Sequence, residues 1–72
     1  MRFVIIGAGR VGLRTAQVLQ EEGHEVVIVE RDQAKAERAE KRNFDVIEGD
    51  GSREEILERA GIEDADALGA LT

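Results

Sequence analysis

A glycine run with G-x-G-x-x-G spacing, Gly7–Gly12, constrains this 72-residue chain more than any other feature of its sequence. It directly follows an apolar segment over residues 2–6 and opens a segment whose apolar residues recur at helical spacing. Alone the pattern is a weak signal, because short glycine patterns arise often by chance. Between a strand and a helix it is typical of a tight loop that holds phosphate groups at a helix N-terminus.

Strand-length apolar runs alternate with helical segments along the rest of the chain. An almost continuously apolar run such as residues 2–6 is typical of a parallel sheet that is covered on both faces. The alternation predicts parallel strands with right-handed helical crossovers. The predicted strands cover residues 2–6, 25–29, 45–48 and 65–71, and the predicted helices cover about residues 10–22, 33–42 and 53–60.

Residues that begin and end helices support these boundaries. Asp32 is predicted to cap the N-terminus of the second helix. Ser52 and Glu55 have the spacing of a capping box for the third helix. The predicted left-handed caps at the helix C-termini are Gly23, Asn43 and Gly61. Apolar positions of the first helix that recur at helical spacing are Val11, Thr15, Val18 and Leu19.

The predicted fold class is α/β, a Rossmann-like parallel sheet of four strands in the order 3-2-1-4 with three helices. It is one partial domain over residues 1–72, truncated relative to a full doubly wound domain. The first two helices cover one face of the sheet and the third lies alone on the other. Because an apolar face left open would form a large hydrophobic patch, we expect either a longer domain or self-association through this face or an edge strand.

Charge and composition exclude several classes of function. The net charge is −6, with 16 acidic and 10 basic residues, which disfavours nucleic acid and anionic membrane surfaces as partners. The chain has no cysteine, which excludes disulfides and thiol chemistry. No apolar run approaches the roughly 20 residues that cross a bilayer, so we expect no membrane insertion and a cytoplasmic location.

The glycine run can bind a pyrophosphate through the N–H groups and the dipole at the start of the helix. Gly7 permits the turn out of the strand, Gly9 permits close approach of the phosphates, and Gly12 permits close packing of the helix on the sheet. Arg10 can add a charge contact, or can be a solvated loop residue. The predicted phosphate-binding residues are Gly7, Ala8, Gly9, Arg10, Val11 and Gly12.

Glu30 ends the second strand, where a carboxylate can accept hydrogen bonds from adenosine ribose hydroxyls. A carboxylate repels a 2′-phosphate, so NAD is predicted over NADP. Arg31 weakens this preference slightly, and it can also stack on adenine or point to water. Asp50 and the following Gly51 and Ser52 lie after the third strand, where adenine would rest; simple turn chemistry explains them equally well.

The segments Met1–Asp32 and Phe44–Leu68 together resemble the N-terminal half of the RCK-type domain of TrkA-like potassium-uptake regulators. The more specific signals are the G-D-[AG]-[ST] loop at Gly49–Ser52 and the A-G-I-x-x-A-D helix end at Ala60–Asp66. The resemblance covers essentially the whole chain. The departure is length, because the later strands and helices of the family's domain are missing.

This resemblance implies a cytoplasmic protein that dimerises, forms rings beneath potassium channels or transporters, and responds to NAD(H) or to ATP/ADP. It implies that Gly7, Gly9, Gly12 and Arg10 hold phosphates and that Glu30 holds the ribose. It also implies that Asp50 and Ser52 lie near adenine, and that Thr72 lies in a fourth strand lining the cleft.

The leading interpretation is a non-catalytic regulatory module that binds an adenine nucleotide. No nucleophile–base pair, tyrosine or catalytic lysine is placed at the ligand edge, so we expect no enzyme activity. The alternatives are the cofactor-binding front half of an NAD-dependent oxidoreductase and a shortened or designed Rossmann fragment. The glycine loop and the acid are common to all three interpretations and do not separate them.

Overall fold

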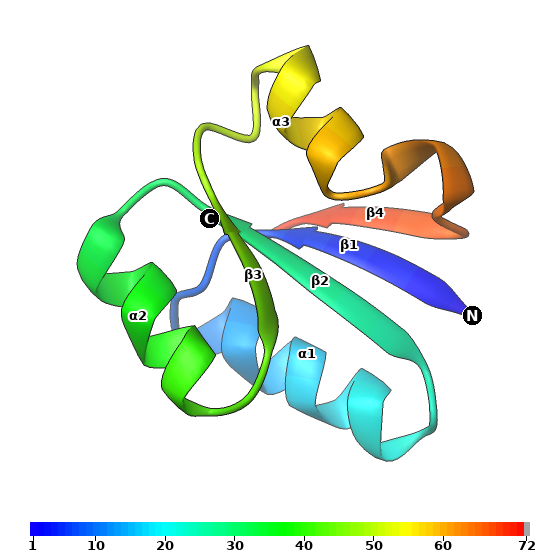
Figure 1. Cartoon of the computed structure of the whole chain (residues 1–72). Coiled ribbons are helices and arrows are strands. Elements are labelled where there is room, and N and C mark those ends of the chain that lie inside the picture. The colour runs from blue at the N-terminus through cyan, green and yellow to red at the C-terminus, as the bar shows by residue number, and fades with distance from the viewer. Residues whose placement is uncertain (72) are drawn as a thin grey trace.

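A computed structural model describes residues 1–71 of the chain. Thr72, predicted to line the cleft, lies outside the described residues. Strands and helices alternate from the N-terminus, as Figure 1 shows. The elements are β1 (Arg2–Ile6), α1 (Arg10–Glu21), β2 (Glu25–Glu30), α2 (Gln33–Lys41), β3 (Asp45–Glu48), α3 (Glu54–Arg59), the 3-10 helix η1 (Ile62–Asp64) and β4 (Ala67–Ala70).

The four strands form one parallel sheet in the order β3-β2-β1-β4. In this register Val4 of β1 pairs with Val27 of β2 and with Leu68 of β4. The predicted α/β class and strand order 3-2-1-4 are therefore confirmed. Because all four strands run in one direction, their carboxyl ends meet at the same edge of the sheet.

Apolar side chains from the two faces of the sheet form two separate clusters. On one face Ile5 and Ile28 pack with Leu13 of α1 and Ala39 of α2. On the other face Val4 and Val29 pack with Ala60, which follows α3. Helices α1 and α2 therefore cover one face and α3 the other, as predicted, and Figure 1 shows α3 on the side of the sheet opposite α1 and α2.

Most of the predicted helix ends are confirmed. The side chain of Asp32 accepts a hydrogen bond from the Lys35 N–H at 3.0 Å and caps α2. Three helix ends adopt a left-handed backbone that satisfies the last carbonyls. The φ values are 89° at Gly23, 66° at Asn43 and 82° at Gly61.

The predicted capping box of the third helix is wrong. The cap residue of α3 is Arg53, and its side chain makes no capping hydrogen bond. Ser52 instead donates its hydroxyl to Asp50 Oδ1 at 2.8 Å, because this acceptor lies only two residues upstream. Helix α3 is also shorter than predicted, and η1 occupies the segment between it and a shorter β4.

Not all of the apolar residues predicted to form one face of the first helix point into the core. Val11 is 63% exposed and Val18 is 48% exposed, whereas Gly12, Leu13 and Ala16 are buried. A Cβ placed on Gly12 would lie 2.1 Å from the carbonyl oxygen of Gly7, so this position faces the end of β1 at very close range. This contact sets the rotation of α1, and Val11 turns to the surface.

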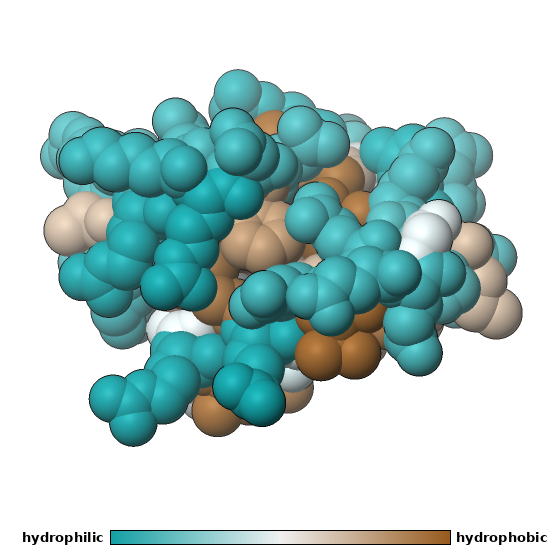
Figure 2. Space-filling model, turned by 90° about the horizontal axis from the view of Figure 1, so that it is seen from below, coloured by the Kyte–Doolittle hydropathy of each residue, from teal (hydrophilic) through white to brown (hydrophobic). Residues whose placement is uncertain are grey.

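The outer side of α1 and α2 is mainly hydrophilic, with smaller hydrophobic areas between the polar side chains (Figure 2). Within residues 1–71, every helix is too short or too polar to cross a bilayer.

We expect the substitution Gly12→Ala to lower the free energy of unfolding by about 2 kcal/mol, because the added methyl overlaps the Gly7 carbonyl. Urea denaturation followed by circular dichroism measures this loss. The matched control is Gly9→Ala in the same loop, where an added Cβ meets nothing within 4 Å and φ is −77°. The control should lose less than about 1 kcal/mol. Equal stability of the two variants would contradict the proposed packing.

Candidate functional site

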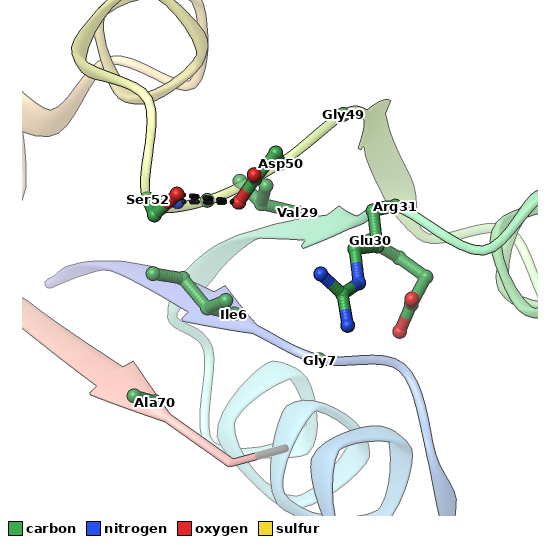
Figure 3. A pocket seen from close by; sticks show the side chains of 10 residues that line it. Ile6, Gly7, Val29, Glu30, Arg31, Gly49, Asp50, Ser52 and Ala70 are labelled. Carbon is green, nitrogen blue, oxygen red and sulfur yellow. Dashed lines mark hydrogen bonds between the residues drawn. The ribbon is translucent and has the colours of Figure 1, made fainter.

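A pocket of about 400 Å³ opens at the carboxyl edge of the sheet (Figure 3). The ends of β1, β2 and β4 and the loop after β3 surround it. The strand order switches direction between β1 and β4, and open α/β sheets bind ligands at the carboxyl edge beside such a switch point. The lining residues are Ile6, Gly7, Val29, Glu30, Arg31, Gly49, Asp50, Gly51, Ser52 and Ala70.

The glycine loop turns from β1 into α1 beside this pocket. Gly7 has a φ of 114°, a backbone conformation that suits glycine, and donates its N–H to the Val29 carbonyl at 2.8 Å. Gly9 precedes the first residue of α1 and carries no capping side chain. The space around its missing Cβ is open to 4 Å. A ligand can therefore approach the backbone at the positive end of the α1 dipole.

The carboxylate of Glu30 holds the glycine loop and the start of α2 in place. Its Oε1 accepts a hydrogen bond from the Ala8 N–H at 2.7 Å, and its Oε2 accepts one from the Asp32 N–H at 2.9 Å. The residue is only 9% exposed, so these two donors compensate for much of the lost hydration. Glu30 therefore joins the second strand to the loop after the first.

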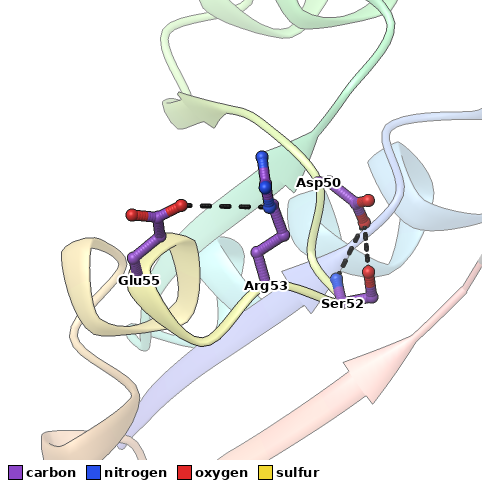
Figure 4. A network of polar contacts seen from close by, with 4 residues as sticks. All are labelled: Asp50, Ser52, Arg53 and Glu55. Atoms are coloured by element: carbon purple, nitrogen blue, oxygen red, sulfur yellow. Dashed lines mark hydrogen bonds and ion pairs between the residues drawn. The ribbon is translucent and has the colours of Figure 1, made fainter.

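Asp50 and Ser52 form a compact turn after β3 (Figure 4). Asp50 Oδ1 accepts hydrogen bonds from the Ser52 N–H at 2.9 Å and from the Ser52 hydroxyl at 2.8 Å. These two bonds, with the positive charges of Arg31 and Arg53, lower the pKa of the Asp50 carboxyl. The Arg53 Nε also lies 3.8 Å from the carboxylate of Glu55. The turn therefore places an Asp50 carboxyl at the pocket rim whose ionised form is favoured.

Close packing explains the glycine that completes this turn. A Cβ on Gly51 would lie 2.8 Å from Cγ2 of Ile6, so the loop after β3 rests directly on the last residue of β1. The missing side chain thereby lets the loop after β3 approach the end of β1, where Asp50 and Gly51 line the pocket. This segment therefore forms a tight turn and also lines the pocket.

The structure brings six of the twelve predicted site residues together in the lining of one pocket. Arg10 lines a different hollow, between α1 and α2. The remaining residues of the glycine loop do not line the pocket: Ala8, Gly9, Val11 and Gly12. The predicted residues that do line the pocket are Gly7, Glu30, Arg31, Asp50, Gly51 and Ser52.

Four lining residues were not predicted, namely Ile6, Val29, Gly49 and Ala70. Ile6 and Ala70 are the last residues of β1 and β4, Val29 is the penultimate residue of β2, and Gly49 directly follows β3. The rule that ligands bind at the carboxyl ends of parallel strands was a sufficient signal for Ile6, Val29 and Gly49.

The parallel sheet, the glycine loop at its first strand–helix turn and the pocket at its carboxyl edge define a Rossmann-like domain. A model of the TrkA-N domain family matches residues 3–72. The chain therefore belongs to the TrkA-N domain family.

Relatives and a solved structure agree with this assignment. A Trk system potassium uptake protein TrkA homolog of Pyrococcus abyssi is 45% identical over 73 residues, covering 100% of this chain and 32% of that protein. The Trk system potassium uptake protein TrkA of Streptomyces coelicolor is 37% identical, over 100% of this chain and 33% of that protein. The chain thus spans about a third of these relatives.

The crystal structure of the TrkA-N domain of inner membrane protein ybaL from Escherichia coli is similar with a TM-score of 0.87 and 25% sequence identity. The match covers 96% of this chain and 51% of that chain. The fold described here is therefore truncated relative to the full domain.

We expect Ser52→Ala to raise the pKa of Asp50, because the hydroxyl that donates to its carboxylate is lost. The pKa should still remain below the ordinary value of an aspartate, since the Ser52 N–H bond is the larger cause and survives. Carboxyl carbon NMR across a pH titration measures the shift. Ser52→Thr, which keeps a hydroxyl, is the control. An unchanged pKa in Ser52→Ala would show that the hydroxyl bond is not formed.

Proposed function

We propose that this chain is a non-catalytic regulatory module of a potassium-uptake system that binds NAD(H), with ATP or ADP as the alternative ligand. The observation that carries the proposal is the Glu30 carboxylate, held at the pocket by two backbone N–H groups beside a glycine loop that is open at Gly9. The potassium-uptake role rests on the names of the relatives. A cytoplasmic location is part of the same proposal.

The phosphates would lie against the start of α1, where the open space at Gly9 lets them reach backbone N–H donors. The ribose would lie against Glu30, because each carboxylate oxygen accepts one backbone bond and retains a free lone pair for a hydroxyl. The adenine would lie near Asp50 and Ser52, which face the same pocket. A contact of Arg10 with the phosphates stays a prediction.

The negative charge of Glu30 favours NAD over NADP, because a 2′-phosphate would be placed against a poorly hydrated carboxylate. Arg31 lines the pocket and offers some compensation. We therefore propose a preference for NAD rather than complete exclusion of NADP.

A sensor is proposed over the front half of an oxidoreductase because the polar side chains at the pocket serve the loops around it. Glu30 holds the glycine loop, and the Ser52 hydroxyl donates to Asp50. Neither arrangement prepares a group for proton or hydride chemistry. An oxidoreductase would need residues outside this chain, and a shortened or designed fragment would bind by the same contacts.

The proposed partners are a second copy of the chain and the membrane subunit of a potassium transporter. Self-association through the α3 side of the sheet or an edge strand stays a prediction. Leu68 on the edge strand β4 is 50% exposed and is a side chain that such a contact would cover.

Calorimetric titration with NADH, NADPH, ATP and ADP tests the proposal. We expect saturable binding of NADH or of ATP and ADP, and at least about tenfold weaker binding in Gly9→Ala, because its methyl occupies the space that the phosphates need. Val18→Ala, at an exposed position of the same helix, is the control and should bind normally.

Two further outcomes bear on the same assignment. Glu30→Gln should lose the preference for NADH over NADPH, because the charge that repels the 2′-phosphate is removed. Absence of binding by all four nucleotides, or full affinity in Gly9→Ala, would contradict the proposed function.

A further inference from the structure

A second hollow, of about 270 Å³, lies between α1 and α2 on the surface seen in Figure 2. Arginines form most of its lining, two from each helix or its end. Leu13, itself only 5% exposed, contributes an apolar wall, and Gln17 contributes an amide. We refer to it as the arginine groove, lined by Arg10, Leu13, Arg14, Gln17, Arg38 and Arg42.

The charge of the arginine groove is opposite to that of the molecule. The chain has 16 acidic and 10 basic residues, and four of those ten basic residues line this one hollow. Like charges that gather in a small space repel one another, and they do so more strongly beside an apolar wall than in open water. The helix dipole favours Arg38 and Arg42 at the C-terminal end of α2, but it disfavours Arg10 at the N-terminus of α1.

The protein's own carboxylates do not neutralise these arginines. The ion pairs found within residues 1–71 are Arg2 with Glu25 and Arg53 with Glu55, and both lie elsewhere. The groove amide of Gln17 donates to Glu21 at 3.3 Å, so that carboxylate is directed along α1. Four guanidinium groups therefore remain available to a ligand.

We propose that the arginine groove binds a compact anion that carries two or more phosphate groups. Guanidinium groups donate paired hydrogen bonds that match phosphate oxygens, and several of them around one hollow suit a multivalent anion. The volume suits a small molecule, and the acidic remainder of the surface repels a nucleic-acid polymer. Binding also relieves the repulsion among the four arginines.

This site is distinct from the pocket at the sheet edge. The two linings share no residue, since the pocket is built from strand ends and the groove from helix sides. Arg10 is the first residue of α1, next to the glycine loop, so it lies where the groove comes nearest to the proposed nucleotide. Arg38 and Arg42 belong to α2 and its end and take no part in the proposed nucleotide site.

Calorimetry with inorganic triphosphate, a probe without adenosine, tests the inference. The double variant Arg38→Gln, Arg42→Gln should bind triphosphate at least about tenfold more weakly than the unmodified protein. Its control is Lys35→Gln, Arg59→Gln, which makes the same charge change outside the groove and should alter the affinity less than twofold. Binding should also fall steeply as salt is raised. Circular dichroism confirms that each variant is folded.

Each remaining outcome decides against the proposal. Absence of saturable triphosphate binding overturns it, as does an equal loss in both double variants, which would indicate only general charge attraction. Unchanged affinity in the Arg38 and Arg42 variant would place triphosphate elsewhere, such as the glycine loop. Tighter binding of a short acidic peptide than of triphosphate would identify a protein segment as the occupant instead.

NADH titration of the Arg38→Gln, Arg42→Gln variant should give normal affinity, which separates this test from that of the proposed function.

Discussion

The site depends on one carboxylate, that of Glu30, and on the two backbone N–H groups that it accepts. Ala8 belongs to the loop after β1, and Asp32 begins the segment that enters α2. A single side chain at the tip of β2 therefore fixes the loops that follow two neighbouring strands. Because Glu30 is nearly buried, removal of either donor would leave a charged group poorly solvated, which makes the arrangement rigid.

The same edge of the sheet is shaped by the absence of side chains. The carbonyl of Gly7 leaves no room for a Cβ at Gly12, and Ile6 leaves none at Gly51. These two contacts bring α1 and the β3 loop against the end of β1. At Gly9, by contrast, a Cβ would meet nothing within 4 Å, so packing within the described residues does not require glycine there.

Much of this architecture could be predicted from the sequence, because the relevant signals are local. Continuous apolar runs identified the strands, Asp32 and Asn43 identified the ends of α2, and the order of elements led to the strand order. The glycine run and Glu30 could be assigned to one edge because parallel strands align their carboxyl ends.

The remaining features depend on contacts that spacing does not encode. Ser52 satisfies the pattern of a helix cap, but Asp50 competes for its hydroxyl from two residues away. Val11 is apolar and correctly spaced, but the Gly12–Gly7 contact turns it outward. The arginine groove combines residues of two helices that lie 21 or more positions apart, such as Gln17 and Arg38, so only the placement of α1 beside α2 reveals it.

The most direct test of the account is a titration of the ¹⁵N-labelled protein with NADH, followed through its backbone amide NMR signals. The account predicts saturable shifts in the amides of Ala8 and Asp32, which Glu30 holds, together with those of Gly9 and Ser52 at the same edge. Amides at the opposite end of the sheet, such as that of His24, should not move. Shifts that leave Ala8 and Asp32 unchanged, or that gather around His24, would contradict a nucleotide site organised by Glu30.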